Sequence, residues 1–354
     1  MTAKKKLLYM MHFDWNWIKQ RPQFIEEQLE DFYDVYVTCV RNYRINNYCN
    51  KDNMSVFYRI PFLARFPQLE RYNYLRRKHF ISKNIQGFNP DIIYITSPDY
   101  IEGIPLSYKG KIVYDCMDDM IAFAPLHRKE NMLRFEKCLA ERADAVIVSS
   151  EQLKSVLSKR YPGVKAKLNV IRNGFNGIIA QIEQRPQNQI YTFCYFGTMG
   201  SWFNFDYLVR SLDEIPDIQY LLIGPRIRAT TVPKHDRIVY IPEVAHGELF
   251  ERTKSADAFI MPFKINDIVL GVDPIKLYEY INFNKNILCV EYPEVKRFDP
   301  FVFFYHDYET FCNQIKEMKK LTNTKYSNEE RLKFLLPNTW EERAKDIVSL
   351  FEAL

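Results

Sequence analysis

The chain contains 354 residues, of which 47% are hydrophobic and 26% charged, as is typical of a folded globular protein and not of a disordered one. This length exceeds the roughly 100 to 200 residues of one domain, so two domains are expected. Residues 1–180 hold 28 of the 49 Lys and Arg and 19 of the 44 Asp and Glu, which leaves the first part at +9 and the remainder at −4. A basic first part is expected to face an anionic surface or substrate.

Targeting and redox signals are weak in this sequence. It contains no run of about 18 apolar residues, so no membrane-spanning helix is predicted. Residues 7–11 are too short an apolar run for a signal peptide and are expected to form the first strand. The seven cysteines are scattered without a Cys-x-x-Cys spacing, so neither a disulfide framework nor a zinc site is indicated. A cytoplasmic location is therefore expected.

Short apolar runs alternate with helical patterns through residues 1–180. This alternation predicts a parallel sheet with helices on both faces. Strands are expected at 7–11, 35–40, 92–96, 112–114, 145–149 and 168–171, and helices at 23–29, 69–85, 131–142 and 152–161.

The segment after the first strand mixes aromatic and polar side chains. Its candidate sugar-binding or acceptor-binding residues are His12, Asp14, Trp15, Trp17, Gln20 and Arg21. Because this segment leaves the carboxyl end of a parallel strand, it is expected at the edge where such sheets bind ligands. Aromatic faces stack on the C–H groups of sugars. The alternative is that the two tryptophans only cover the domain.

Residues 59–78 interleave basic and aromatic side chains. The basic residues are Arg59, Arg65, Arg71, Arg76, Arg77 and Lys78. Such a segment suits peripheral contact with anionic headgroups or the diphosphate of a lipid-linked acceptor. No nucleic-acid-binding motif accompanies it, so nucleic acid is not an expected partner. An ordinary solvated helix face is the alternative.

Three carboxylates, Asp115, Asp118 and Asp119, follow the strand expected at 112–114. Crowding of like charges raises the pKa of at least one carboxyl group, as a general base near neutral pH requires. Asp118 and Asp119 are favoured as the base and Asp115 comes third. The alternatives are a helix N-cap and a metal-binding Asp-x-Asp.

A polar stretch at 181–189 is expected to link the first α/β set to a second one. Strands are predicted there at 192–196, 220–223, 238–241, 258–261, 287–290 and 302–305. Helices are predicted at 205–212, 247–254, 275–283, 309–319 and 328–334, with a last helix at 339–354 after Pro337. His246 is expected to be a helix cap or a surface residue.

Two loops of this second set are suited to a diphosphate. Gly197, Thr198 and Gly200 follow a buried strand, where glycine lets a backbone approach phosphate closely. Lys276 lies in the first turn of the helix that Pro274 begins, and Glu279 lies one turn later. The cation suits a diphosphate and the carboxylate suits ribose hydroxyls. The alternatives are glycines that serve only a turn, and a solvated Lys–Glu pair.

Residues 195–200, 220–225, 241–243, 256–263 and 274–290 occur in an order that resembles the donor-binding signature of GT-B glycosyltransferases. These enzymes build bacterial exopolysaccharide, capsule and O-antigen chains, and the resemblance runs over nearly the whole sequence. It implies an α/β fold with two Rossmann-like domains whose parallel sheets face each other across a cleft. It further implies an acceptor-binding domain at 1–180, a nucleotide-sugar-binding domain at 190–336 and a C-terminal helix at 337–354 that crosses back to the first domain.

The resemblance also implies an activity, the transfer of a hexose from a UDP- or GDP-linked donor to a glycan or lipid-linked acceptor. Pro242, Glu243 and Val244 match the segment whose backbone holds the nucleobase, and Asp273 and Leu277 are counted with the donor site. No cofactor or metal is implied. The enzyme is expected in the cytoplasm, at the inner face of the membrane if residues 59–78 contact lipid.

The stereochemistry follows from a departure in the donor helix. Retaining GT-B enzymes commonly carry two glutamates eight positions apart, and here Glu279 matches the second while Gly271 stands at the first. This favours inversion with an Asp base, as in the similar xanthan-type glucuronosyltransferases. Two alternatives remain open, a sugar-nucleotide 2-epimerase of the same fold and a non-catalytic glycan-binding or assembly protein.

Overall fold

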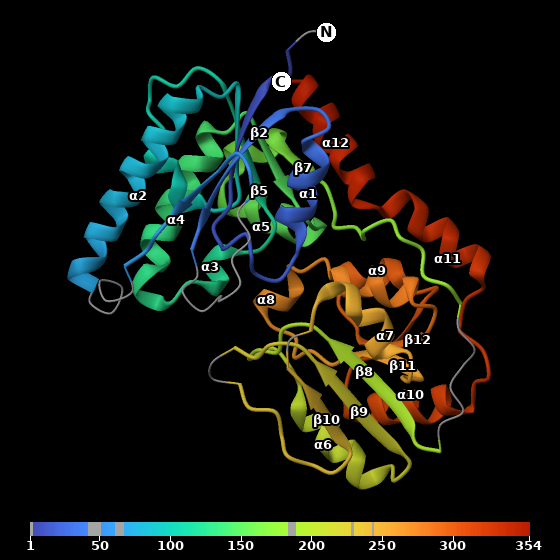
Figure 1. Cartoon of the computed structure of the whole chain (residues 1–354). Coiled ribbons are helices and arrows are strands. Elements are labelled where there is room, and N and C mark those ends of the chain that lie inside the picture. The colour runs from blue at the N-terminus through green and yellow to red at the C-terminus, as the bar shows by residue number, and fades with distance from the viewer. Residues whose placement is uncertain (1–2, 42–50, 61–66, 183–188, 228–229, 243) are drawn as a thin grey trace. The chain divides into compact units, whose positions relative to one another are not determined.

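The structure is a computed structural model that describes residues 3–41, 51–60, 67–182, 189–227, 230–242 and 244–354 (Figure 1). The chain forms two compact units. Unit 1 comprises Met1–Arg172 together with Trp340–Leu354, and unit 2 comprises Asn173–Thr339. The first boundary lies between residues 172 and 173, before the linker expected at 181–189, and the second lies three residues after the one expected between 336 and 337.

The described residues of unit 1 form a seven-stranded sheet in the order β3-β2-β1-β4-β5-β6-β7, in which every pairing is parallel. The strands are β1 Lys6–Met10, β2 Asp34–Val40, β3 Met54–Phe57, β4 Ile92–Ile95, β5 Lys111–Cys116, β6 Ala145–Val148 and β7 Leu168–Val170. Residues 7–10 of β1 are fully buried, because a central parallel strand is covered on both faces and therefore consists of a continuous apolar run.

The helices of unit 1 include the C-terminal one. They are α1 Arg21–Leu29, α2 Pro67–Phe88, α3 Met120–Phe123, α4 Leu126–Arg142, α5 Glu151–Arg160 and α12 Trp340–Glu352, with 3-10 helices η2 Pro98–Gly103 and η3 Pro162–Lys167. Figure 1 shows α12 in red beside α1, where the Trp340 ring stacks on Phe24 with 5.2 Å between centroids. Phe351 contacts Tyr33 at 5.5 Å. The last helix therefore returns to the first unit, as the fold class predicts.

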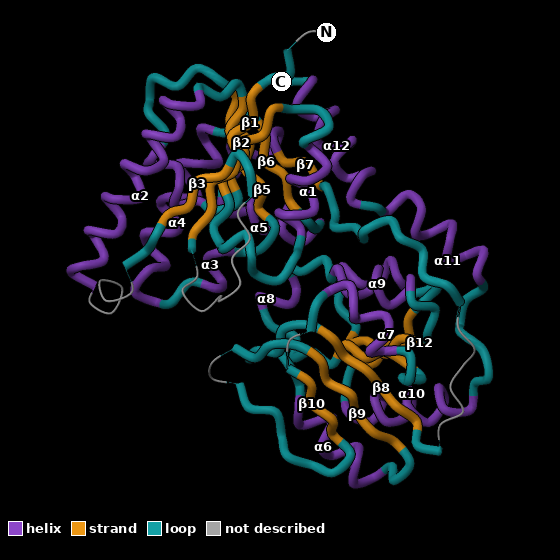
Figure 2. The backbone as a smooth tube through the Cα atoms, viewed as in Figure 1, coloured by secondary structure: helices purple, strands orange, loops and turns teal. Residues whose placement is uncertain are grey.

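The described residues of unit 2 form a six-stranded parallel sheet in the order β10-β9-β8-β11-β12-β13 (Figure 2). Its strands are β8 Tyr191–Phe196, β9 Ile218–Ile223, β10 Ile238–Ile241, β11 Ala258–Met261, β12 Asn286–Val290 and β13 Val302–Tyr305. Its helices are α6 Phe205–Glu214, α7 Leu249–Thr253, α8 Asp267–Leu270, α9 Ile275–Asn282, α10 Tyr308–Lys320 and α11 Asn328–Leu335, with 3-10 helices η4 His246–Glu248, η5 Pro293–Phe298 and η6 Leu336–Asn338.

The predicted fold class, an α/β protein with two Rossmann-like units, is confirmed, and a few elements differ from expectation. β3 was not predicted, because three of its four residues are only half-buried and an edge strand gives little apolar signal. α4 begins at Leu126 and not at 131, since the solvent-facing residues of its first turns lack an apolar period. The helix expected at 247–254 is η4 followed by the short α7.

Strand order reverses once in each sheet, which fixes where ligands are expected. In unit 1 the reversal lies between β1 and β4, and in unit 2 it lies between β8 and β11. Open parallel sheets bind ligands outside the carboxyl ends of the strands at such a point. The segment after β1 contains His12, and the segment after β8 contains Gly197. These two segments therefore occupy the favoured positions. Within the described ranges, no helix combines the length and apolar character needed to span a membrane.

Candidate functional site

Lys276 lies directly on the backbone of Gly197. A Cβ built on Gly197 would come within 2.1 Å of Lys276 Cε and 2.8 Å of Lys276 Nζ. Gly197 also has a φ of +132°, a backbone conformation that side-chain-bearing residues rarely adopt. The backbone angle therefore favours glycine here, and any larger residue would also displace the end of the Lys276 side chain. The first turn of α9 and the loop after β8 therefore lie in contact.

The loops after β8 and β9 are pressed together by a second glycine. A Cβ on Gly224, whose φ is +130°, would lie 2.4 Å from the Gly197 carbonyl oxygen. The Gly197 amide donates to the Ile223 carbonyl at 2.8 Å, and the Tyr195 hydroxyl donates to the Thr198 carbonyl at 2.9 Å. The loop that carries Gly197 and Thr198 is thus fixed from both sides. Gly224 was not predicted as a site residue, although its segment contributed to the resemblance.

The Glu279 carboxylate contacts a residue that was not among the predicted site residues. His246 Nε2 lies 2.7 Å from Glu279 Oε1, although His246 was expected to be only a cap or surface residue. Burial lowers the pKa of Lys276, and the Glu279 carboxylate acts in the opposite direction. An ammonium group that is partly stripped of water gains strongly from an anionic ligand. The pair therefore offers a cation and an oriented hydrogen-bond acceptor at the carboxyl edge of the sheet.

The remaining residues of the predicted donor site fall into different surroundings. Gly200 packs on Trp202, since a Cβ there would lie 2.7 Å from the indole ring. Pro242 follows β10, and its carbonyl accepts a hydrogen bond from the Gly224 amide at 3.0 Å. Val244 is half-buried against the core of unit 2. Glu243 lies outside the described residues.

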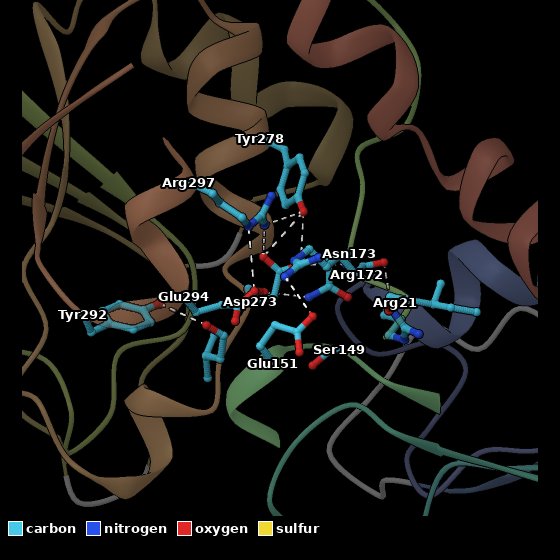
Figure 3. A network of polar contacts seen from close by, with 12 residues as sticks. Arg21, Ser149, Glu151, Arg172, Asn173, Asp273, Tyr278, Tyr292, Glu294 and Arg297 are labelled. Atoms are coloured by element: carbon cyan, nitrogen blue, oxygen red, sulfur yellow. Dashed lines mark hydrogen bonds and ion pairs between the residues drawn. The ribbon is translucent and has the colours of Figure 1, made fainter. Parts of the chain in front are cut away.

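Asp273 and Leu277 serve the interior, which corrects the expectation that they contact the donor. Leu277 is fully buried in the core. Asp273 accepts hydrogen bonds from the Asn173 amide at 2.7 Å and the Tyr278 hydroxyl at 3.1 Å, and it pairs with Arg297 (Figure 3). With its side chain wholly buried, this carboxylate is committed to holding the unit 2 interior.

In unit 1, Asp115 and Arg21 form a buried ion pair. The Arg21 Nε and a terminal nitrogen donate to the two Asp115 oxygens at 2.9 and 3.1 Å, and the Tyr94 hydroxyl donates to Asp115 at 2.8 Å. Arg21 also donates to the carbonyls of residues 171 and 172. Both side chains are at most 2% exposed. This corrects two predictions, since Asp115 is too enclosed to act as the base and Arg21 is engaged internally.

Asp119 is a helix cap, as the alternative interpretation of Asp-Asp predicted. Its Oδ1 accepts from the amides of Ile121 and Ala122 at 3.1 and 3.3 Å. Arg160 pairs with Asp119 at 2.8 Å and with Glu136 at 2.7 Å. A carboxylate with this set of partners is oriented toward the protein and is occupied by the helix cap and the ion pair.

Asp118 has the environment of a general base. Burial raises its pKa to about 7, with further increases from the charges of Asp115 and Asp119 and an opposing effect from Arg21. Its side chain is half-buried, and within the described part of the chain its carboxylate has no hydrogen bond or ion pair. A carboxyl group of this kind changes protonation state near neutral pH, as proton transfer from an alcohol requires.

The segment after β1 is only partly available to a ligand. Asp14 is 2% exposed and accepts from the Asn16 amide at 2.9 Å. Gln20 caps α1, and Lys51 lies 4.4 Å from the centre of the Trp15 indole. Trp17 contacts the Phe13 ring at 5.8 Å between centroids and is 41% exposed, so part of its side chain stays accessible to a sugar.

His12 lies beside β4 and is neutral. Its ring Nδ1 and its backbone amide contact Thr96 Oγ1 at 2.9 and 3.2 Å. Burial lowers the pKa of His12 to about 4, so the imidazole carries no charge at neutral pH. Its contribution to ligand binding would therefore be a hydrogen bond.

Comparisons with known proteins support this architecture. No family model matches the chain. A Bacillus subtilis (strain 168) protein, provisionally named teichuronic acid biosynthesis glycosyltransferase TuaH, is 21% identical over 217 residues, which cover 55% of this chain and 54% of the relative. The chain thus matches about half the length of that relative.

Solved structures match over almost the whole chain. Sucrose-phosphate synthase from Thermosynechococcus elongatus superposes with a TM-score of 0.74 at 13% identity, covering 99% of both chains. Anabaena Alr3699/HepE in complex with UDP and glucose gives a TM-score of 0.70 at 14% identity, covering 99% of this chain and 100% of the other. The chain therefore has the GT-B fold.

Proposed function

We propose that this protein is a GT-B glycosyltransferase that moves a sugar from a nucleotide-linked donor to an acceptor hydroxyl with inversion of configuration. The observation that carries the proposal is the seating of Lys276 on Gly197, with Glu279 one turn further along α9. A cation on a glycine loop, at the carboxyl edge of a parallel sheet, is suited to a diphosphate. HepE, which shares the fold, binds UDP and glucose.

The donor would be held by groups of unit 2. The Lys276 ammonium would contact the diphosphate at the N-terminal end of α9, where the helix dipole favours an anion. Glu279 would accept hydrogen bonds from ribose hydroxyls, with its orientation fixed by His246 at 2.7 Å. When the sugar leaves, negative charge develops on the nucleoside diphosphate, and Lys276 stabilises that charge.

Asp118 of unit 1 would provide the base. As the acceptor oxygen attacks the anomeric carbon, the carboxylate takes the hydroxyl proton and the bond from the anomeric carbon to the diphosphate breaks on the opposite side. The nucleoside diphosphate departs with the electron pair of that bond. A positioned general base of this type contributes about 10² to 10⁴ in rate.

The proposed setting is bacterial surface-polysaccharide synthesis in the cytoplasm, with a glycan or a lipid-linked glycan as the acceptor. Its support is the name of the Bacillus subtilis relative and the basic first part of the chain. Peripheral contact with the membrane through residues 59–78 belongs to the same proposal.

Calorimetric titration of the intact protein with UDP, GDP and their sugar conjugates tests the donor site. Lys276→Met is expected to weaken the preferred nucleotide about 10-fold or more, because a charge-assisted hydrogen bond to phosphate is lost. Lys316→Met, which removes an exposed cation on α10 of the same unit, is the matched control and should bind normally. Equal affinity for the parent and the Lys276 variant would refute the site.

A second measurement separates the base from the donor site. Asp118→Asn should keep the nucleotide affinity of the parent while turnover falls by about 10² to 10⁴. An asparagine variant that retains full turnover would exclude Asp118 as the base and leave the donor site untouched.

A further inference from the structure

The residue proposed as the base, Asp118, lies between β5 and α3, and hydrogen bonds from two buried side chains hold the backbone there. The Ser149 hydroxyl, fully buried after β6, donates to the Met117 carbonyl at 2.8 Å. The Cys116 thiol, at the end of β5, donates to the Asp118 carbonyl at 3.5 Å. The segment that carries Asp118 is therefore tied to two neighbouring strands of the sheet.

Arg160, the last residue of α5, holds the residue that follows Asp118. Its two terminal nitrogens donate to the two Asp119 oxygens at 3.3 and 2.8 Å. Two parallel hydrogen bonds between a guanidinium and a carboxylate fix the direction of the carboxylate as well as contributing energy. Because Asp119 also caps α3, Arg160 fixes the start of that helix directly after Asp118.

Arg160 is itself held by Glu136 of α4. Its Nη1 donates to Glu136 Oε2 at 2.7 Å, and the Tyr161 hydroxyl donates to the same oxygen at 3.0 Å. The other carboxylate oxygen accepts from the Tyr114 hydroxyl of β5 at 3.2 Å. Glu136 is fully buried, so loss of its cation would be costly and the guanidinium is confined to this position. We call Arg160, Asp119, Glu136, Tyr114 and Tyr161 the Arg160 network.

The Arg160 network also affects the charge around Asp118. Among the described residues, charges act on Asp118 from Arg21 of α1, Asp115 of β5 and Asp119. Burial is the main cause of the raised pKa of Asp118, while Arg21 lowers this pKa and the two carboxylates raise it further. Arg160 lies 2.8 Å from Asp119 and offsets part of its negative charge. The network therefore controls how strongly Asp119 favours the protonated form of Asp118.

The position of Asp118 matters because proton transfer requires hydrogen-bond reach. A general base must approach the proton donor to about 2.6 to 3.2 Å, and a displacement of about 1 Å can cost about 100-fold in rate. Within the described part of the chain, the Asp118 carboxylate has no hydrogen bond or ion pair that would fix its direction. Its position therefore depends on the contacts of the backbone at 117–119.

We propose that Arg160 is a positioning residue for sugar transfer, which acts through Asp119 to hold Asp118 where it can take the proton of the acceptor. This inference rests on the proposed glycosyltransferase function and on Asp118 as its base. Arg160 was not among the predicted site residues, since its partners Glu136 and Asp119 lie 24 and 41 residues away in the sequence. The alternative is a network that only stabilises the packing of α4 and α5.

The test is the kinetics of the full chain with the nucleotide sugar that binds best in the calorimetric titration, followed as release of the nucleoside diphosphate. Water serves as the acceptor probe, because a carboxylate that deprotonates an acceptor hydroxyl also deprotonates water. At a pH where Asp118 is ionised, Arg160→Met should lower kcat about 10- to 100-fold by releasing the Asp118 segment. Its nucleotide affinity should stay within about 2-fold of the parent, since the proposed donor contacts belong to unit 2.

Asp119→Asn tests the same contact in a variant that is expected to fold. Asparagine is as good an N-cap as aspartate, so the cap of α3 is kept while the charge that Arg160 binds is lost. This variant should also lower kcat, and the double variant should lose no more than about 3-fold beyond the larger single loss, because both changes break one contact. Lys159→Met is the matched control, which removes an exposed cation from the same turn of α5 and should keep the parental kcat.

The pH profile of kcat separates positioning from stabilisation of the fold. Asp119→Asn removes a negative charge beside Asp118 and should move the midpoint near pH 7 to lower pH, whereas Arg160→Met should move it to higher pH. Arg160→Lys keeps the charge but loses the planar fork, so it should keep the parental midpoint and still lose turnover. Variants that unfold at lower urea concentration but keep the parental kcat and pH profile would overturn the proposal.

Failure of this inference and failure of the proposed function give different results. If Asp118→Asn loses turnover while Arg160→Met and Asp119→Asn keep the parental kcat and pH profile, only the positioning role is wrong. If Asp118→Asn keeps full turnover, the proposed base is wrong and the inference fails with it. If the protein binds no nucleotide, the glycosyltransferase function itself is wrong.

Discussion

The fit between Gly197 and Lys276 allows a quantitative test by Gly197→Ala. An alanine at a φ of +132° is held in a sparsely populated region, at a cost of about 1 to 3 kcal/mol in the free energy of unfolding. Its methyl group would also displace the Lys276 side chain, which approaches to 2.1 Å of the added Cβ. We therefore expect weaker nucleotide binding, by about 10- to 100-fold if the charge-assisted contact is lost.

Urea unfolding measures the first effect and calorimetric titration with the preferred nucleotide measures the second. Gly247→Ala is the matched control in the same unit, because a Cβ there meets nothing within 4 Å. A double-mutant cycle with Lys276→Met separates strain from displacement. If Gly197 acts through Lys276, the affinity losses of the two single variants overlap, with a coupling of about 0.5 to 3 kcal/mol. Additive losses, or an alanine variant with parental affinity, would refute the reasoning.

Four further predictions concern the other charged residues. Because the pKa of Asp118 is raised to about 7 and the carboxylate is the active form, turnover should increase as pH rises through 7, whereas Asp118→Asn should show a low and flat pH profile. The same raised pKa means that the folded state retains a proton after the unfolded state has lost it, so the free energy of unfolding of the parent should fall relative to Asp118→Asn between about pH 4 and 7. Arg21→Met should lower the free energy of unfolding by about 3 to 5 kcal/mol, because it leaves Asp115 buried without its cation, and Arg21→Met with Asp115→Asn should recover part of that loss in urea unfolding. His246→Ala should weaken nucleotide binding less than Lys276→Met does, since it frees Glu279 to rotate without removing it. The control is His306→Ala in the same unit, where the histidine side chain is 63% exposed. This control should leave the nucleotide affinity unchanged.

The strands and helix α9 were predictable because their signals are local. Residues 7–10 of β1 are fully buried and consecutive, so the run of apolar letters alone marks a central parallel strand. The position of Lys276 in the first turn of α9 followed from Pro274, a residue suited to a helix start. The edge strand β3 was missed because its half-buried residues carry no comparable signal.

The roles of individual charged residues were harder to predict, because their partners are far away in the sequence. Asp273 was predicted as a site residue because it is a carboxylate next to the start of α9. Its partners are instead Asn173, 100 residues earlier, and Arg297, 24 residues later. His246 meets Glu279 across 33 residues. Only the folded chain shows which carboxylate is enclosed by donors and which histidine supports a neighbour.

A general distinction between scaffold charges and ligand-binding charges follows from these contacts. Two ion pairs, Arg21 with Asp115 and Arg297 with Asp273, have fully buried carboxylates. In each pair the opposite charges compensate each other inside the protein. Lys276 instead rests on a glycine backbone with a carboxylate one turn away. A cation that the fold desolvates without full compensation gains most from an incoming anion. This criterion selects Lys276 as a contact for a phosphate-bearing ligand, and it rejects Arg21, which had been a candidate for binding the sugar or the acceptor.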